Sequence, residues 1–181
     1  MGSGEEILTV GHSNHEERRF LELLGGAGVE SLADVRANPR SRYPQFNRSA
    51  LAAALQAAGI GYFHLGEQLG GRRDPLAESQ NRGWEKEWFR GYADHMASTD
   101  FASGLGRLEE LAHGRRAVVM CAEADWRRCH RRLIADALLI RGWSVLHLDG
   151  NGVLEAHEMT EFAEVDAGRL TYPERQTSMD L

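Results

Sequence analysis

The chain has 181 residues, of which 42% are hydrophobic and 20 are glycine, so its composition is that of a globular domain with a substantial core. No apolar run reaches the roughly 18 residues of a membrane span, and the start MGSGEEILTV lacks the basic and apolar regions of a signal peptide. Two cysteines, Cys121 and Cys129, are too few for a disulfide scaffold, which favours a reducing compartment. We therefore expect a cytoplasmic protein that makes no membrane contact.

The formal net charge of −6 argues against a protein that coats nucleic acid in general. Eight acidic and two basic residues in 149–181 account for this whole excess, so residues 1–148 are neutral overall. Of the 21 basic residues, only Lys86 is lysine. Since arginine richness on its own indicates no function, only the positions of the arginines are informative.

Apolar and β-branched runs alternate along the chain with segments of helical periodicity. The runs predict five strands, at 7–10, 31–35, 61–65, 117–120 and 144–148. A helix is predicted after Ser13, whose spacing to Glu16 is that of a capping box. Further helices are predicted at 49–58, 84–97, 101–113 and 131–140, with an acidic surface helix at 156–167. The alternation predicts a single three-layer α/β domain over 1–181, with about five mainly parallel strands, helices on both faces and an acidic extension at 149–181.

Residues with reactive or charged side chains cluster after the predicted strands. In open α/β sheets, ligands bind outside the carboxyl ends of the strands. The residues predicted at that edge are His12, Ser13, Arg36, Arg40, Ser41, His64, Cys121, Glu123, Cys129, His130 and Arg131. This clustering predicts a functional site at the carboxyl edge of the sheet.

Cys121 is the candidate nucleophile. It ends an apolar strand a few residues before a helix, where the helix N-terminus and nearby arginines would lower the pKa of a thiol. The alternative is a small buried side chain that completes the strand. The segment lacks the C-x5-R spacing of phosphatase loops, because Arg127 is the sixth residue after Cys121.

Glu123 and His130 are the candidates for proton transfer. Glu123 could instead pair with Arg36 or Arg131, because a carboxylate beside a thiolate would raise the pKa of both groups. His130 could instead cap the following helix or bind a metal ion. The sequence leaves these roles open.

A metal site is a further alternative, although the sequence requires no cofactor. Six residues together have donor atoms that would suit zinc or iron: Cys121, Glu123, Cys129, His130, His12 and His64. However, C-x7-C-H is not a standard zinc spacing, and a redox pair of the two cysteines would require the loop between them to fold back. We therefore assign no metal, and Cys121, Cys129 and His130 are the candidates if one is bound.

Several residues at this edge are candidates to bind an anion. They are Arg36, Arg40, Arg131, His12, Ser13, Ser41 and His64, and planar guanidinium groups in particular suit phosphate. Aromatic residues nearby that could stack on a base are Tyr43, Phe46 and Trp126. The alternative is a solvated loop whose aromatic residues close the core. A further aromatic group has helical spacing and is expected in the core: Trp84, Trp88, Phe89 and Tyr92.

Four motifs together resemble the bacterial 488 family of domains of unknown function: T-V-G-H-S, D-V-R-A-N-P-R-S, L-G-G, and M-C-A-E followed by C-H-R. The resemblance extends from about Thr9 to about Leu148 and implies a cytoplasmic single domain without an established chemistry. A fainter resemblance is to rhodanese-like sulfurtransferases, which also have D-V-R after an early strand and a Cys at the end of a buried strand. The acidic, Trp-containing stretch after Cys121 departs from the short loop of those enzymes.

These observations favour a small enzyme that acts on an anionic, phosphate-bearing substrate such as a nucleotide or nucleic acid. One alternative is a module that binds nucleotide or nucleic acid through the same arginines without catalysis. Another is a metal-dependent enzyme with Cys and His ligands. The reaction type does not follow from the sequence.

Overall fold

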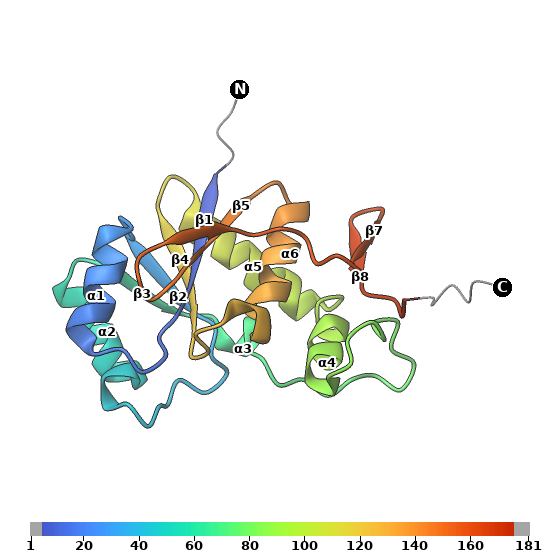
Figure 1. The fold of residues 1–181 in the computed structure, drawn as a ribbon, viewed down its shortest axis with the longest axis horizontal. Helices are drawn as coiled ribbons and strands as arrows, with labels where there is room; N and C mark the ends of the chain where they lie inside the picture. Colours follow the sequence, from blue (N-terminus) through green and yellow to red (C-terminus); the bar gives the residue numbers. More distant parts are fainter. Residues whose placement is uncertain (1–4, 176–181) are drawn as a thin grey trace.

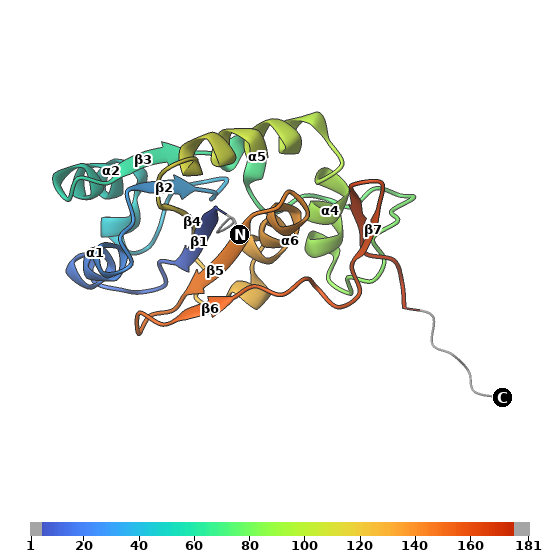
Figure 2. The ribbon, with the colours of Figure 1, turned by 90° about the horizontal axis from the view of Figure 1, so that it is seen from above.

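The computed structural model describes residues 5–175, in which a six-stranded sheet separates two layers of helices (Figures 1 and 2). The strands follow the spatial order β3-β2-β4-β1-β5-β6. Their bounds are Glu6–Gly11 (β1), Ser31–Asp34 (β2), Gly61–His64 (β3), Ala117–Cys121 (β4), Ser144–Leu148 (β5) and Leu154–Ala156 (β6). The first five strands are parallel and β6 pairs with β5 antiparallel, so the predicted three-layer α/β fold is confirmed with one added strand.

The connecting segments contain α-helices and two short 3-10 helices. Their bounds are Glu17–Gly26 (α1), Pro44–Phe46 (η1), Arg48–Ala57 (α2), Gly66–Leu69 (α3), Glu87–His95 (α4), Thr99–Ala112 (α5), Trp126–Arg128 (η2) and Arg131–Ile140 (α6). A hairpin of β7 (Glu164–Asp166) and β8 (Arg169–Thr171) lies apart from the main sheet. Among the described residues, no helix has both the length and the apolar character needed to cross a membrane.

The alternation of side chains along the central strand creates two hydrophobic layers. Val118 and Met120 of β4 pack with the apolar side chains of α1 and α2. Ala117 and Val119 of the same strand pack with those of α4, α5 and α6. Figure 1 shows α1 and α2 on one side of the sheet and α5 and α6 on the other. Both faces of the central strands are therefore covered, as is usual for a mainly parallel sheet.

The register of the parallel strands brings their carboxyl ends together. Gly11 of β1 is opposite Cys121 of β4, and Asp34 of β2 is opposite Met120 of β4. The segments that follow β1, β2 and β4 are therefore neighbours at one edge of the sheet. This arrangement brings together segments that carry many of the predicted site residues.

The prediction that Ser13 caps the first helix is wrong. Helix α1 begins only at Glu17. Ser13 has a φ of 47°, in the left-handed region, and its backbone N–H donates to the carbonyl of Ala122 at 3.0 Å. The turn after β1 is thus fixed by the loop after β4, a contact that local sequence does not report.

The predicted acidic helix at 156–167 is also wrong. The chain there forms β6, an irregular segment and then β7. The His157 backbone N–H donates to Val145, and the Thr160 backbone N–H donates to the buried carboxylate of Asp136. These bonds to residues far away in the sequence replace the hydrogen bonds that a helix would make.

Candidate functional site

A pocket of about 820 Å³ opens at the carboxyl edge of the sheet, and we call it the Cys121 pocket. Its walls come from the segments that follow β2, α3 and β4 and from the start of α4. Six of the predicted residues line it: Arg36, Arg40, Cys121, Glu123, Cys129 and His130. The structure therefore brings the candidate nucleophile, both candidates for proton transfer and two of the predicted arginines to one place.

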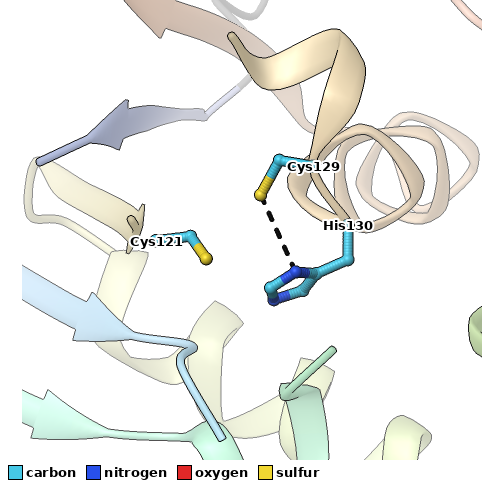
Figure 3. A group of neighbouring side chains, drawn as sticks. All are labelled: Cys121, Cys129 and His130. Atoms are coloured by element: carbon cyan, nitrogen blue, oxygen red, sulfur yellow. Dashed lines mark hydrogen bonds between the residues drawn. The ribbon is translucent and has the colours of Figure 1, made fainter. Parts of the chain in front are cut away.

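Cys121, Cys129 and His130 face one another in this pocket (Figure 3). One donor atom of each, either a sulfur or a ring nitrogen, lies within 4.8 Å of the other two. The Sγ atom of Cys129 lies 3.7 Å from Nδ1 of His130. Cys121 is partly exposed, whereas Cys129 and His130 are buried. The loop between the two cysteines does fold back, which the sequence had given no reason to expect.

Local contacts explain why this loop folds back. The Asp125 carboxylate accepts a hydrogen bond from the backbone N–H of Arg127 and so caps η2. The buried Arg131 side chain donates to the backbone carbonyl of Glu123. Gly11 makes the close approach feasible, because a Cβ at that position would collide with the same carbonyl oxygen.

The two thiols have opposite pKa shifts. Burial would raise the pKa of Cys129, but a hydrogen bond from Cys121 and the positive charge of Arg131 hold it well below that of an ordinary thiol. The Nε atom of Arg131 donates to Cys129 Sγ at 3.3 Å. The hydrogen bond to Cys129, together with burial, raises the pKa of Cys121. Of the two thiols, Cys129 is therefore the more acidic and Cys121 the less acidic.

Arg36 and His12 are held by other protein groups. The Asp34 carboxylate accepts hydrogen bonds from Nε and Nη2 of Arg36 at 2.9 and 2.7 Å, and the Phe46 carbonyl accepts one from Nη1 at 2.8 Å. The His12 ring stacks on Phe46 with a centroid distance of 4.2 Å. Burial lowers the pKa of His12 to about 4. His12 is therefore neutral near pH 7, and Arg36 pairs with Asp34 and not with Glu123.

Arg131 and His64 lie outside the Cys121 pocket. Arg131 is only 1% exposed, and its guanidinium contacts the loop before it. The Nε2 atom of His64 donates to the Arg36 carbonyl at 2.8 Å. Both side chains thus hold the segments that form the pocket.

Three other predicted residues line a neighbouring pocket of about 510 Å³, namely His12, Ser13 and Ser41. Ala122 and Glu123 line both pockets. Apart from Arg131 and His64, the predicted residues are therefore divided between two adjacent pockets, and Glu123 lines both.

Three exposed arginines surround the Cys121 pocket: Arg40, Arg72 and Arg128. None of them takes part in the ion pairs found within residues 5–175. Only Arg40 was predicted as a site residue. Arg72 follows the Gly70-Gly71 turn, whose sequence indicated no more than a turn, and Arg128 stood in a run of arginines with nothing to distinguish it.

The sequence matches the family model described as "Domain of unknown function DUF488" over residues 17–138. The chain belongs to the DUF488 family. No curated protein and no solved structure gives a match. Every residue that lines the Cys121 pocket lies inside the matched part of this DUF488 chain, whereas His12 and Ser13 precede it.

The aromatic residues around the Cys121 pocket differ from those predicted to stack on a base. Phe46 is buried beneath His12, and the Trp126 ring stacks on His147 with a centroid distance of 3.9 Å. Tyr43 lines the neighbouring pocket. Trp88, expected in the core, is half-buried and lines the Cys121 pocket. Its place in the first turn of α4 keeps it at the surface, where it stacks on Phe89.

A buried polar network anchors α6, the helix that follows His130 of the Cys121 pocket. Thr9 Oγ1 lies 2.6 Å from His147 Nδ1, and His147 Nε2 lies 2.9 Å from His157 Nδ1. His157 Nε2 in turn lies 2.8 Å from the Asp136 carboxylate, which also accepts a hydrogen bond from the Tyr172 hydroxyl. Burial and the neighbouring His157 lower the pKa of His147 to about 2. The network joins β1, β5, α6 and the C-terminal segment.

Proposed function

We propose that this protein is an enzyme that acts on an anionic, phosphate-bearing substrate held in the Cys121 pocket. One observation carries the proposal: exposed arginines that have no carboxylate partner within residues 5–175 surround a pocket in which two cysteines and a histidine meet. Guanidinium groups bind phosphate through paired hydrogen bonds, so the arginines would hold the substrate. The Cys121–Cys129–His130 group would supply the chemistry, with Glu123 beside it for proton transfer.

A nucleotide or nucleic acid is the substrate class that the pocket suits best. Trp88 and Arg72 both line it, so a base could stack on the indole while the arginines hold a phosphate group. The two unpaired cysteines suit a reducing cytoplasm, where such substrates are abundant.

Calorimetric titration with inorganic phosphate, a nucleoside monophosphate and a short oligonucleotide tests the binding half of the proposal. We expect at least one of these ligands to bind. Arg128→Ala should weaken that binding by about 10- to 100-fold, because hydrogen bonds to charged groups contribute roughly 1.5–3 kcal/mol. Arg115→Ala is the control, since Arg115 is exposed just before β4, at the opposite end of that strand from Cys121. If none of the three ligands binds the unaltered protein, the proposal is wrong.

Mass spectrometry of the ligand after incubation tests the catalytic half. We expect Cys121→Ser to bind the ligand as the unaltered protein does but to leave it unconverted. If the unaltered protein binds the ligand without converting it, the protein is the binding module that the sequence leaves as an alternative.

A further inference from the structure

The donor atoms of Cys121, Cys129 and His130 lie close enough together to bind one metal ion. All three atoms lie within 4.8 Å of one another, and the Cys129 Sγ to His130 Nδ1 distance is 3.7 Å. With Zn–S bonds of about 2.3 Å and Zn–N bonds of about 2.0–2.1 Å, the ligand atoms of a tetrahedral zinc site lie roughly 3.5–3.8 Å apart. Figure 3 shows both sulfurs and the imidazole ring turned toward a common centre.

The tautomer of His130 also fits a metal ligand. The Nε2 atom lies 3.1 Å from the Val35 carbonyl oxygen. A carbonyl oxygen only accepts hydrogen bonds, so Nε2 carries a hydrogen, and Nδ1, on the side of the sulfurs, is the ring nitrogen that could bind an ion. Metal-bound histidines are commonly oriented by such a bond from the other ring nitrogen.

Gly71 allows the backbone to pass close to the His130 ring. Gly71 lies against the ring, and a Cβ at this position would lie 2.8 Å from Nδ1. A side chain there would press on the nitrogen that faces the sulfurs. A glycine at this place therefore leaves room for the ring to bind an ion.

The protein supplies three donor atoms, and the fourth side of the group opens on the Cys121 pocket. Within residues 5–175 the group contains no other Cys, His, Asp or Glu. Cys121 is partly exposed, and all three residues line the pocket. Three protein ligands with an open fourth position are typical of catalytic zinc, whereas structural zinc sites have four protein ligands.

We infer that Cys121, Cys129 and His130 bind a zinc ion whose fourth coordination position faces the Cys121 pocket. The inference rests on the proposed function for its chemical role, because the substrate in that pocket would meet the ion. With both sulfurs bound to zinc, water replaces sulfur as the nucleophile.

The reaction class that follows is hydrolysis of a phosphate ester. A zinc-bound water would give one proton to the Glu123 carboxylate, and its oxygen would form a bond to phosphorus. The bond from phosphorus to the leaving alcohol oxygen would break, and that alcohol would take the proton from Glu123. No oxidant, reductant or second substrate is needed.

Metal content tests the site directly. The protein is prepared without a polyhistidine tag in the presence of a thiol-free reductant, exposed to zinc and desalted, and zinc is measured by plasma mass spectrometry. We expect about one zinc ion per chain. Loss of a group that only orients a metal ligand lowers the metal affinity by roughly 10- to 100-fold. Cys129→Ser and His130→Ala change ligands themselves, so each should lower the zinc affinity by more than this. His113→Gln, which changes an exposed histidine paired with Glu5, should keep the zinc.

Cobalt replacement gives a second measurement, whose main result is obtained on the unaltered protein. The unaltered protein with cobalt should show the strong visible absorption of a tetrahedral site and a near-ultraviolet sulfur-to-cobalt band. Cys121→Ser should halve the intensity of that band per bound cobalt. Less than about a tenth of a zinc ion per chain in the unaltered protein, with no sulfur-to-cobalt band, would overturn the inference.

The titrations with phosphate compounds separate this inference from the proposed function. Zinc bound to a protein that binds none of those ligands supports the metal site and overturns the proposed function. Ligand bound to a protein that takes up neither zinc nor cobalt overturns the metal site and leaves the proposed function in place.

Discussion

The Asp34 carboxylate binds the Arg36 guanidinium through both of its oxygens, at 2.9 and 2.7 Å, in a pair that is almost completely buried. Tyr62 of the neighbouring strand donates a third hydrogen bond to this carboxylate at 2.6 Å. Asp34 ends β2, and Arg36 lies in the segment that lines the Cys121 pocket. The pair therefore fixes the pocket wall to the sheet.

Removing Arg36 should destabilise the protein. Arg36→Ala would leave the Asp34 charge buried without its partner, and breaking such a pair costs about 3–5 kcal/mol. Arg36→Lys should restore only part of the loss, because an ammonium group cannot bind both oxygens as a guanidinium does. Urea denaturation measures the free energy of unfolding, with Arg115→Ala as the control. A change below about 1 kcal/mol in Arg36→Ala would mean that the pair contributes little, as exposed ion pairs do.

Trp88 should distinguish nucleotides from simple phosphate. We expect Trp88→Ala to weaken nucleotide binding by about 10- to 100-fold, because stacking of a base on an aromatic ring contributes roughly 1–3 kcal/mol. The affinity for inorganic phosphate should stay the same, and Trp88→Phe should recover most of the nucleotide affinity. Calorimetric titration with both ligands provides the comparison. An equal loss for both ligands would show that the indole supports the arginines and does not contact a base.

Gly11 should not tolerate a side chain. A Cβ at Gly11 would meet the Glu123 carbonyl oxygen, so Gly11→Ala must displace the loop between the two cysteines. We expect a loss of at least about 1–3 kcal/mol in thermal or urea unfolding, the usual cost of overpacking. Gly106→Ala is the matched control, since Gly106 lies in α5 with nothing near its Cβ position. That control should gain roughly 0.5–1 kcal/mol from helix propensity. Equal effects of the two substitutions would contradict the contact.

His147 should make stability depend on pH in the acid range. Its pKa is about 2 in the folded protein and 6.5 when exposed, so the unfolded chain binds one more proton between these values. The contribution of His147 to the free energy of unfolding is therefore at its full value above about pH 7. It falls by about 1.4 kcal/mol per pH unit as the pH drops below 6.5. His147→Gln should be less stable at pH 7 but should show a flatter decline between pH 6 and 4 in urea unfolding. The same slope in both proteins would mean that His147 does not titrate in this way.

The sequence by itself determined the architecture and the edge of the sheet at which the Cys121 pocket lies. Strand and helix periodicity predicted the parallel α/β sheet, because each strand carries enough apolar residues to be covered on both faces. The position of reactive residues after the strands located the pocket, since parallel strands end at one edge. Cys121, Glu123, His130, Arg36 and Arg40 could be assigned to it in this way.

The partners of the charged and reactive groups were decided only by the tertiary structure. Arg36 could have paired with Asp34 or Glu123, and the choice depends on which carboxylate the folded loop places within reach. The sulfurs of Cys121 and Cys129 meet because Arg131 and Gly11 hold the loop between them, and neither contact leaves a pattern in the local sequence. The segment 156–167 likewise lost its predicted helix to hydrogen bonds with Val145 and Asp136. Side-chain periodicity reports which face of an element is buried, whereas these pairings depend on distances between elements that are set only when the layers pack together.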